Sequence, residues 1–384
     1  MTSSLNEKLA VFTLQLGTLP ETFIRLHVED LLPGRTVSVA RFSSHVMGGY
    51  WEASCPVLFL DQWALRLPVR LARRVGVSEG QLCTSRIGRF LREHRVGKVI
   101  GEYLDQFVDF VPMLDEMDIP YVVQGHGNDL SASLRTPGMS ERFGAFASAR
   151  AILTRCEFHR QRLIKLGLPA EKIHVNPGGV HVPGEPPKRG PQAMKRFLAI
   201  GRMVPKKGPI YLLEAFRQAA AVDPEITLDY LGDGELLPAV RQFVDALRLG
   251  SKVRVHGPGS NGTKQRLFEE CGVFVQHSIT DPDSGNEEGL PASIQEGMAY
   301  GMPVISTRHA GIPEAVEEGK IGWLVDECDV AAMSRAMIQI ASENGTCAKF
   351  GAAAHAKAAQ SYSWPAERSR LLGHLGLSES ADPF

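Results

Sequence analysis

The chain has 384 residues, of which 43% are hydrophobic and 22% are charged, and its formal net charge is −1. This length predicts two domains that each bury a core, and the balanced charge gives no overall reason to expect a nucleic-acid partner. Six scattered cysteines, no signal peptide and no run of about 18 apolar residues argue against a disulfide framework, a cysteine zinc site and a membrane span, so we expect a soluble, cytoplasmic protein with reduced thiols.

Short apolar runs alternate with helical patterns along the chain, which is typical of parallel sheets covered by helices. In the first half we predict strands at residues 9–14, 36–41, 98–101, 121–124, 151–154 and 173–176. In the second half we predict strands at residues 196–201, 227–232, 253–256, 273–276, 303–306 and 322–325. The pattern predicts an α/β fold of two doubly wound, Rossmann-like domains, whose ligands bind at the loops that follow the strands.

A Pro/Gly-rich segment at residues 182–191 separates the two halves and can continue neither a helix nor a sheet. We interpret it as the inter-domain linker. The predicted domains are residues 1–185 and 186–360, followed by a closing segment at residues 361–384.

In the first half, a basic stretch runs from Asp61 to Lys98 and holds nine cations against three acids. The cations are Arg66, Arg70, Arg73, Arg74, Arg86, Arg89, Arg92, Arg95 and Lys98. From residue 86 to 95 an arginine recurs at every third position, which places most of these side chains along one side of a helix. Two interpretations stay open: a solvated basic face, or a surface for an anionic membrane or the pyrophosphate of a lipid-linked acceptor.

Two loops of the first domain follow predicted strands. Gly17 follows the first strand, and Gln124-Gly-His-Gly-Asn-Asp129 follows a buried one. The glycines on either side of His126 let the backbone approach a ligand closely. We therefore take His126 and Gly17 as candidate site residues, with a loop cap and a plain turn as the respective alternatives.

In the second domain, Ile200-Gly-Arg-Met-Val-Pro-Lys-Lys-Gly208 follows the first predicted strand. Arg202 comes at the strand end and Lys207 begins the next helix, so the two cations can converge on one anion. Fixed cations stabilise a diphosphate most strongly when it gains charge as a leaving group. The alternative is a pair of solvated basic residues.

The segment Asn286-Glu-Glu-Gly-Leu-Pro-Ala-Ser-Ile-Gln-Glu296 leads into a helix with Pro291 at its expected first position. The free N–H groups of that turn and the helix dipole form an anion site. Glu288 precedes the helix, and Glu296 lies roughly 8 Å beyond Pro291 at about 1.5 Å per residue. One carboxylate can thus bind a sugar and the other a ribose, with a diphosphate between them. Two solvated acids are the alternative.

Together these motifs resemble the retaining glycosyltransferases of family 4, which have the two-domain GT-B fold. The central matches are Gly-Arg-x4-Lys-Gly at residues 201–208, Leu-Gly-Asp-Gly at 231–234 and Glu-x7-Glu at 288–296. Further matches are His-Gly-x-Asp at 126–129, Asn-Pro-Gly-Gly-Val-His at 176–181, Ser363-Trp364, and Pro20-Glu-Thr-Phe-Ile24, which is similar to a variant in bacterial exopolysaccharide transferases. The resemblance covers nearly all of the second domain and a few loops of the first. It implies two domains that face each other across a cleft, with the C-terminal helix crossing back to the first.

The resemblance also implies roles for the donor-binding residues. Arg202 and Lys207 hold the diphosphate of a nucleotide sugar. The backbone around Gly289, Leu290 and Pro291 assists them.

The other implied contacts are with the sugars and the base. Glu296 binds the ribose hydroxyls, and Glu288 binds the transferred sugar. His126 contacts that sugar from the facing domain. The loop that begins at His256 lies near the base, and Gly17 is a further candidate contact.

The expected function is retaining transfer of a hexose from a UDP- or GDP-linked donor to a glycan or lipid-linked saccharide in exopolysaccharide or related glycan biosynthesis. We expect no cofactor and no metal. Asp281-Pro-Asp283 is similar to the Asp-x-Asp of metal-dependent transferases of another fold, but Arg202 and Lys207 already supply the positive charge, and a polar loop is the simpler interpretation. The alternatives are a non-catalytic nucleotide-sugar-binding or regulatory protein and a sugar-nucleotide epimerase on the same fold.

Overall fold

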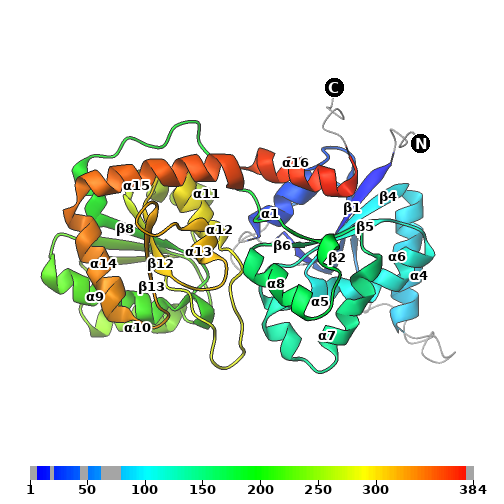
Figure 1. Ribbon diagram of the computed structural model, residues 1–384, viewed down its shortest axis with the longest axis horizontal. Helices are drawn as coiled ribbons and strands as arrows, with labels where there is room; N and C mark the ends of the chain where they lie inside the picture. Colours follow the sequence, from blue (N-terminus) through cyan, green and yellow to red (C-terminus); the bar gives the residue numbers. More distant parts are fainter. Residues whose placement is uncertain (1–6, 18–20, 44–50, 62–78, 378–384) are drawn as a thin grey trace. The chain divides into compact units, whose positions relative to one another are not determined.

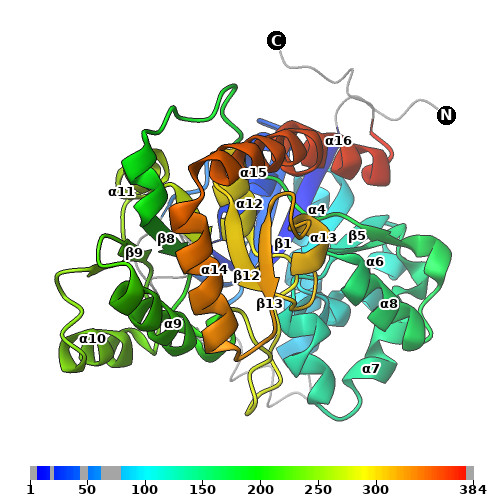
Figure 2. The same cartoon turned by 60° about the vertical axis from the view of Figure 1, so that its left-hand side comes forward.

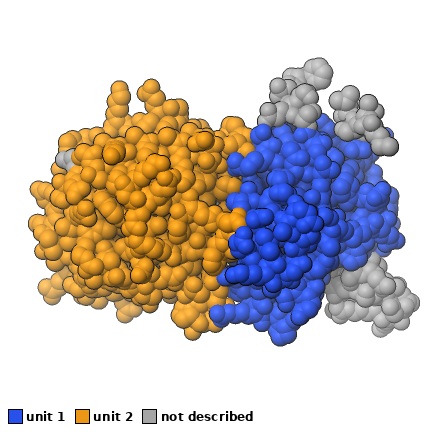
Figure 3. Space-filling view, viewed as in Figure 1, with its two compact units in different colours: residues 1–154, 160–176, 368–384 blue, residues 155–159, 177–367 orange. Residues whose placement is uncertain are grey.

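A computed structural model describes residues 7–17, 21–43, 51–61 and 79–377 of the chain. The chain divides into two compact units (Figure 3). Unit 1 is residues 1–154, 160–176 and 368–384, and unit 2 is residues 155–159 and 177–367. The chain therefore passes between the units at 154/155, 159/160, 176/177 and 367/368. The sequence placed the boundaries at 185/186 and 360/361.

The described strands of unit 1 form one parallel sheet in the order β3-β2-β1-β4-β5-β6-β7. The strands are β1 (Lys8–Leu16), β2 (Thr36–Ser43), β3 (Val57–Phe59), β4 (Val96–Glu102), β5 (Tyr121–Gln124), β6 (Ala151–Thr154) and β7 (Ile173–Val175). In the register, Val11 of β1 lies opposite Ser38 on one side and Ile100 on the other. The strand order reverses between β1 and β4, so the loops after these two strands lie at the switch point where doubly wound sheets bind ligands.

Helices and helical turns connect the strands in the part of the chain before residue 177 (Figure 1). They are α1 (Thr22–Arg25), η1 (Leu26–Asp30), α4 (Glu79–Glu93), α5 (Leu104–Phe107), η2 (Val108–Phe110), α6 (Val111–Glu116), η3 (Asn128–Leu130), η4 (Ala132–Arg135), α7 (Met139–Arg142), η5 (Phe143–Ser148), α8 (Glu157–Lys165) and η6 (Ala170–Lys172). Phe107 of α5 packs edge-to-face on Phe12 of β1 with 5.6 Å between ring centroids, which places the aromatic core of unit 1 directly beneath the switch-point loops.

The described strands of unit 2 also form a parallel sheet, in the order β10-β9-β8-β11-β12-β13. They are β8 (Arg196–Ile200), β9 (Thr227–Leu231), β10 (Val253–Gly257), β11 (Val273–Val275), β12 (Val304–Thr307) and β13 (Gly322–Val325). The order reverses between β8 and β11, which places the loops after these strands at the switch point of this sheet.

Helices cover both faces of the second sheet (Figure 1, Figure 2). From residue 177 on, the helices and turns are η7 (Pro191–Lys195), η8 (Pro205–Lys207), α9 (Pro209–Val222), α10 (Leu237–Ala246), α11 (Asn261–Glu270), α12 (Ala292–Ala299), α13 (Ile312–Ala315), α14 (Val330–Ser342), α15 (Asn344–Lys357), η9 (Ala358–Tyr362) and α16 (Trp364–Leu375). Successive side chains of a strand point to opposite faces. Phe197 therefore packs with α9, α10 and α14, while Leu198 packs with α11, α12 and α15.

Each strand that the sequence predicted is present, with ends that differ by two residues at most. The sequence missed β3, an edge strand of three residues in which Leu58 alone is buried. Such a short run does not show the alternation that reveals a strand.

The basic stretch is only partly described, because residues 62–78, with Arg66, Arg70, Arg73 and Arg74, lie outside the described residues. On α4, Ile87 and Leu91 are buried while Arg89 and Arg92 are exposed, which agrees with a basic face on an amphipathic helix. In the described parts of the chain, no helix is long and apolar enough to cross a membrane. A membrane or acceptor role for this stretch stays a prediction.

Candidate functional site

The loop after β8, at residues 201–207, places three basic side chains at the switch point of unit 2. Arg202 is exposed, Lys206 is buried, and Lys207 is half-buried. The loop ends at Gly208, whose φ is +50°. A Cβ atom there would lie 2.3 Å from the backbone oxygen of His277, so only glycine fits this turn, which sets the position of Lys207.

Glu288 joins this loop to the loop before α12. Its Oε1 lies 3.3 Å from Nζ of Lys207 and 3.5 Å from Nζ of Lys206. Burial alone raises the pKa of a carboxyl group, but the positive charges of the two lysines and of Arg202 outweigh it and lower the pKa of Glu288 to about 2. Burial in turn lowers the pKa of Lys207, although the charge of Glu288 opposes this. At neutral pH Glu288 is therefore an anion among cations.

Lys206 also fixes the backbone of the same loop. Its Nζ donates to Oδ1 of Asn286 at 3.2 Å and to the backbone oxygen of Glu287 at 3.0 Å. Lys206 is not among the site residues predicted from the sequence. The sequence shows two adjacent lysines, Lys206 and Lys207, and does not distinguish their roles. The burial of Lys206 in the structure does so.

A histidine holds the backbone of Glu288 from the other side. The backbone N–H of Glu288 donates to Nε2 of His309 at 3.0 Å, and Nδ1 of His309 lies 2.6 Å from Oε1 of Glu327. Because Nε2 accepts, the ring proton is on Nδ1 and is donated to Glu327. This pair sets the path of the chain just before α12.

The start of α12 differs from the predicted one by a single residue. Pro291, with φ −64° and ψ 124°, is the N-cap residue, and the helix begins at Ala292. Gly289 accepts a hydrogen bond from the backbone of Gly311, and Leu290 is buried. The first N–H groups of a helix have no partner within it. The turn after Pro291 is thus an anion-binding terminus beside Glu288.

Two further predicted residues of unit 2, Glu296 and His256, form hydrogen bonds with side chains outside the cluster around Glu288. Glu296, in the second turn of α12, accepts a hydrogen bond from Nζ of Lys264 on α11 at 2.5 Å. His256 lies in β10, and its Nε2 is 2.7 Å from Oδ1 of the buried Asp229. The structure brings Arg202, Lys207 and Glu288 together, while the side chain of His256 is directed to Asp229 on the sheet.

Asp281 and Asp283 form a polar loop. The carboxylate of Asp281 accepts hydrogen bonds from the backbone N–H of Asp283 and from the hydroxyl of Ser284. Among the residues in the described ranges, no group of three or more His, Cys, Asp or Glu side chains is arranged to hold a metal ion. These contacts agree with the polar-loop interpretation of the Asp-Pro-Asp sequence.

In unit 1, the predicted residues Gly17 and His126 both follow strands of the sheet. Gly17 is buried with φ +98°, and its backbone oxygen accepts a hydrogen bond from Trp51. After β5, the buried Asp129 accepts hydrogen bonds from the backbone N–H groups of His126 and Gly127. Asp129 thus fixes the loop that carries the histidine.

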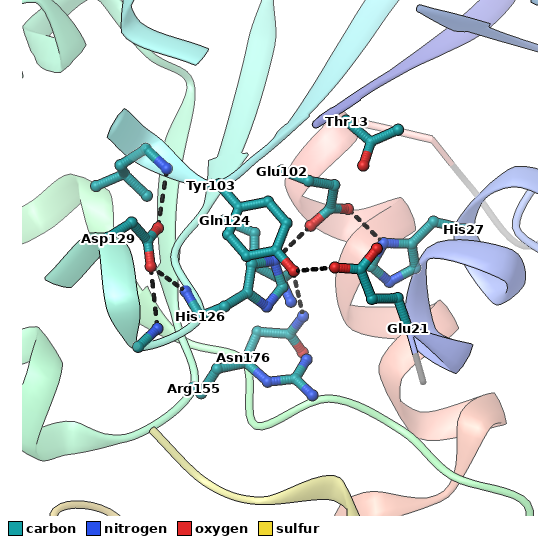
Figure 4. Close-up of polar contacts among 12 residues, drawn as sticks. Thr13, Glu21, His27, Glu102, Tyr103, Gln124, His126, Asp129, Arg155 and Asn176 are labelled. Atoms are coloured by element: carbon teal, nitrogen blue, oxygen red, sulfur yellow. Dashed lines mark hydrogen bonds and ion pairs between the residues drawn. The ribbon is translucent and has the colours of Figure 1, made fainter. Parts of the chain in front are cut away.

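A polar network surrounds His126 (Figure 4). Its Nε2 lies 2.6 Å from Oε2 of Glu102, and the other oxygen of Glu102 lies 2.6 Å from Nδ1 of His27. Beside them, the hydroxyl of Tyr103 donates to Oε1 of Glu21 at 2.8 Å. Glu21, Glu102 and His27 are not among the site residues predicted from the sequence. The available signal was a charged residue at the carboxyl end of the apolar strand β4, at the switch point.

Comparison with known proteins agrees with these features. Residues 186–357 match the family model for glycosyl transferases group 1. The chain is 34% identical over 176 residues to WcaL of Escherichia coli, a glycosyltransferase provisionally named for colanic acid biosynthesis, with 45% of this chain and 43% of WcaL covered. It is 29% identical over 218 residues to the amylovoran biosynthesis glycosyltransferase AmsK of Erwinia amylovora, with 55% of this chain and 52% of AmsK covered.

A solved structure extends the comparison to the whole fold. HepE of Anabaena, in complex with UDP and glucose, superposes with a TM-score of 0.75 over 96% of this chain and 99% of HepE, at 16% identity. At this identity the likeness shows the fold alone. It confirms the expected GT-B architecture of two Rossmann-like domains.

The matched region carries the site of unit 2. The chain spans about half the length of the curated relatives it matches. Residues 186–357 nevertheless include the whole second sheet together with Arg202, Lys207, Glu288 and Glu296. The match to the group 1 glycosyl transferases thus lies in the part of the chain that holds these residues.

Proposed function

We propose that this protein is a retaining, metal-independent glycosyltransferase that moves a hexose from a UDP- or GDP-linked donor to a glycan or lipid-linked saccharide acceptor, in exopolysaccharide or related glycan biosynthesis. The observation that carries the proposal is the cluster of Arg202, Lys207 and Glu288 beside the N-terminus of α12. The cluster lies at the switch point of unit 2, where a doubly wound sheet binds nucleotides.

The charges of the cluster suit a departing diphosphate. Lys206 and Lys207 are paired with Glu288, just before α12, and the charge of Arg202 also acts on Glu288. A diphosphate there meets cations and helix N–H groups together. When the bond to the sugar breaks, the diphosphate gains charge, and groups already in place stabilise that charge without reorganising. These cations supply the compensation that a metal ion provides elsewhere, and they are the basis for proposing metal independence.

The two carboxylates suit hydroxyl groups at either end of the diphosphate. Glu288 is ionised and can accept hydrogen bonds from a sugar. Glu296, in the second turn of α12, can accept them from a ribose. In unit 1, contact between His126 and the transferred sugar stays a prediction from the family resemblance. Any role of Gly17 stays a prediction from its place after the first strand. HepE shares this fold and binds UDP and glucose, which supports a nucleotide-sugar donor, and the polysaccharide names of the relatives support a saccharide acceptor.

The test is turnover of a donor panel without acceptor. The full chain is incubated with UDP- and GDP-linked hexoses, with and without chelator, and release of nucleoside diphosphate is followed. We expect slow release from at least one donor, undiminished by chelator. Proton NMR of the freed sugar, recorded before it mutarotates, should show the α-hexose first from an α-linked donor, and the β-hexose first would contradict retention. Binding without any release would favour a nucleotide-sugar-binding protein, and restoration of a lost activity by magnesium or manganese would contradict metal independence.

A further inference from the structure

The carboxylate of Glu102 bridges two histidine rings that come from distant parts of unit 1. His27 lies in η1 and is fully buried, and His126 lies in the loop after β5. Each oxygen of Glu102 is 2.6 Å from one ring nitrogen, Nδ1 of His27 and Nε2 of His126 (Figure 4). Glu102 itself is 1% exposed. A buried carboxylate with a separate partner for each oxygen holds both rings in fixed orientations.

The charge state of Glu102 determines where the ring protons lie. Burial raises the pKa of Glu102, but the charge of His27 and the hydrogen bonds from both rings outweigh it and lower the pKa to about 2. An ionised carboxylate only accepts hydrogen bonds. Both ring nitrogens that face it must therefore carry a proton, which is Nε2–H in the case of His126.

The opposite nitrogen of His126 is left available. Its ring stacks on Phe23 with 4.4 Å between centroids and packs against Tyr103 at 4.6 Å. Within the described ranges of the chain, no group forms a hydrogen bond with Nδ1 of His126. The nearby charged groups, Glu21 and Asp129, bond instead to the hydroxyl of Tyr103 and to backbone N–H groups. Phe23 and Tyr103 pack against the ring of His126, and Glu102 contacts its Nε2. Among these contacts, none involves Nδ1.

We propose that Glu102, supported by His27, is a positioning residue that fixes His126 as its Nε2–H tautomer and so presents Nδ1 to the transferred sugar. The role toward the sugar rests on the proposed function; the tautomer does not. In the neutral ring Nδ1 then accepts a hydrogen bond from a sugar hydroxyl. A carboxylate that orients a catalytic histidine acts in the same way elsewhere.

The first arm of the test measures the tautomer in the full chain labelled with 15N-histidine. Two-bond 1H–15N spectra are recorded at a pH of about 8, above the ordinary range of histidine ionisation, and the His126 signals are identified by their loss in His126→Gln. We expect the Nε2–H form in the wild type. In Glu102→Gln the amide oxygen can accept from only one ring, so both tautomers of His126 should appear. An Nδ1–H form in the wild type, or an unchanged spectrum in Glu102→Gln, overturns the proposal.

The second arm measures donor turnover. We expect Glu102→Gln to lower the rate of nucleoside diphosphate release about 10- to 100-fold, the usual cost of losing a partner that orients a functional histidine, with unchanged affinity for UDP. His27→Leu should cause a similar loss and His27→Asn should restore most of the rate, because the Asn amide replaces the Nδ1–H donor. The matched control is Asp109→Asn, an exposed acid paired with Arg142.

The two arms separate the two proposals. An equal loss of rate in Asp109→Asn, or a full rate in Glu102→Gln despite mixed tautomers, contradicts the positioning role toward the sugar. A wild type that releases no nucleoside diphosphate from any donor contradicts the proposed function, and the tautomer spectra then still decide whether Glu102 sets the ring proton of His126.

Discussion

Nζ of Lys207 lies 3.3 Å from Oε1 of Glu288, and this contact joins the loop after β8 to the loop before α12. The two residues are 81 positions apart in the chain, yet β8 and β11 are neighbours in the sheet, so the loops that follow them meet. The pair places a cation and an anion side by side at the switch point of unit 2. A diphosphate and a sugar hydroxyl can each engage one member of this pair.

Removing either member should abolish transfer. We expect Lys207→Met and Glu288→Ala each to lower kcat/KM by at least about 100-fold, the scale of losing one fixed group that stabilises charge in a transition state. Nucleoside diphosphate release from the best donor of the panel gives the rates, and circular dichroism checks the fold. Lys320→Met is the control, since Lys320 is exposed and pairs only locally with Glu317. Near-normal turnover in either site variant would show that the site is assigned wrongly.

Lys206 should affect stability more than Lys207 does. Its replacement by Met removes the donor for Oδ1 of Asn286 and for the backbone oxygen of Glu287. Asn286 and Glu287 are half-buried, so water can replace part of what is lost, and the cost stays below the roughly 1–3 kcal/mol of a fully buried unsatisfied acceptor. We expect urea unfolding of Lys206→Met to show a free energy of unfolding lower by about 1–2 kcal/mol. Lys320→Met again serves as the control. An unchanged midpoint would mean that Lys206 does not hold the loop.

Acid should destabilise unit 2 partly through Glu288. Its pKa is about 2 in the folded protein against an ordinary value of 4.5, so its charge stabilises the fold above pH 4.5, and this contribution is lost as the pH falls toward 2. The shift corresponds to a few kcal/mol at most, at about 1.4 kcal/mol per pKa unit. We expect the free energy of unfolding to fall less steeply between pH 4.5 and 2 in Glu288→Gln than in the wild type.

Urea titrations at several pH values measure that slope. Glu318→Gln is the matched control, because this half-exposed acid pairs with Arg308 at the surface. Equal slopes for the wild type and Glu288→Gln would contradict the electrostatic account of the cluster.

The carboxylate of Glu296 should accept hydrogen bonds from the ribose hydroxyls of the donor. If it binds them, Glu296→Ala weakens binding of UDP by about tenfold, the range of one to two hydrogen bonds to a charged group, but leaves binding of 2′,3′-dideoxy-UDP nearly unchanged. Isothermal titration calorimetry with each nucleotide gives the dissociation constant of the variant relative to that of the wild type. Lys264→Met should weaken UDP binding less than Glu296→Ala, since Lys264 only orients the carboxylate. An equal loss for both nucleotides would place Glu296 away from the ribose.

The fold and the positions of Arg202, Lys207 and Glu288 in unit 2 could be predicted because each depends on a short stretch of sequence. A buried parallel strand is a short apolar run, and the residue after it falls at the ligand-binding edge of the sheet. Arg202 and Lys207 follow β8 in this way, and Glu288 comes before a helix that begins near a proline. The start of α12 differed by one residue because Pro291 adopts an extended ψ and caps the helix.

The partners that complete each site could not be predicted, because they are distant in sequence. Glu102 meets His27 across 75 positions, and Glu296 meets Lys264 across 32. The edge strand β3 was missed because its three residues are too few to show an alternating pattern. Its position depends on pairing with β2. Such contacts follow from the register of the sheets and the packing of helices, which no local pattern encodes.

The most direct test of the central claim is a crystal structure of the full chain soaked with a UDP-linked hexose. The account predicts that the diphosphate lies within hydrogen-bond distance of Lys207, Arg202 and the first N–H groups of α12, with Glu288 against the sugar and Glu296 against the ribose. A diphosphate bound elsewhere on the protein, with these residues unchanged from their present contacts, would contradict it.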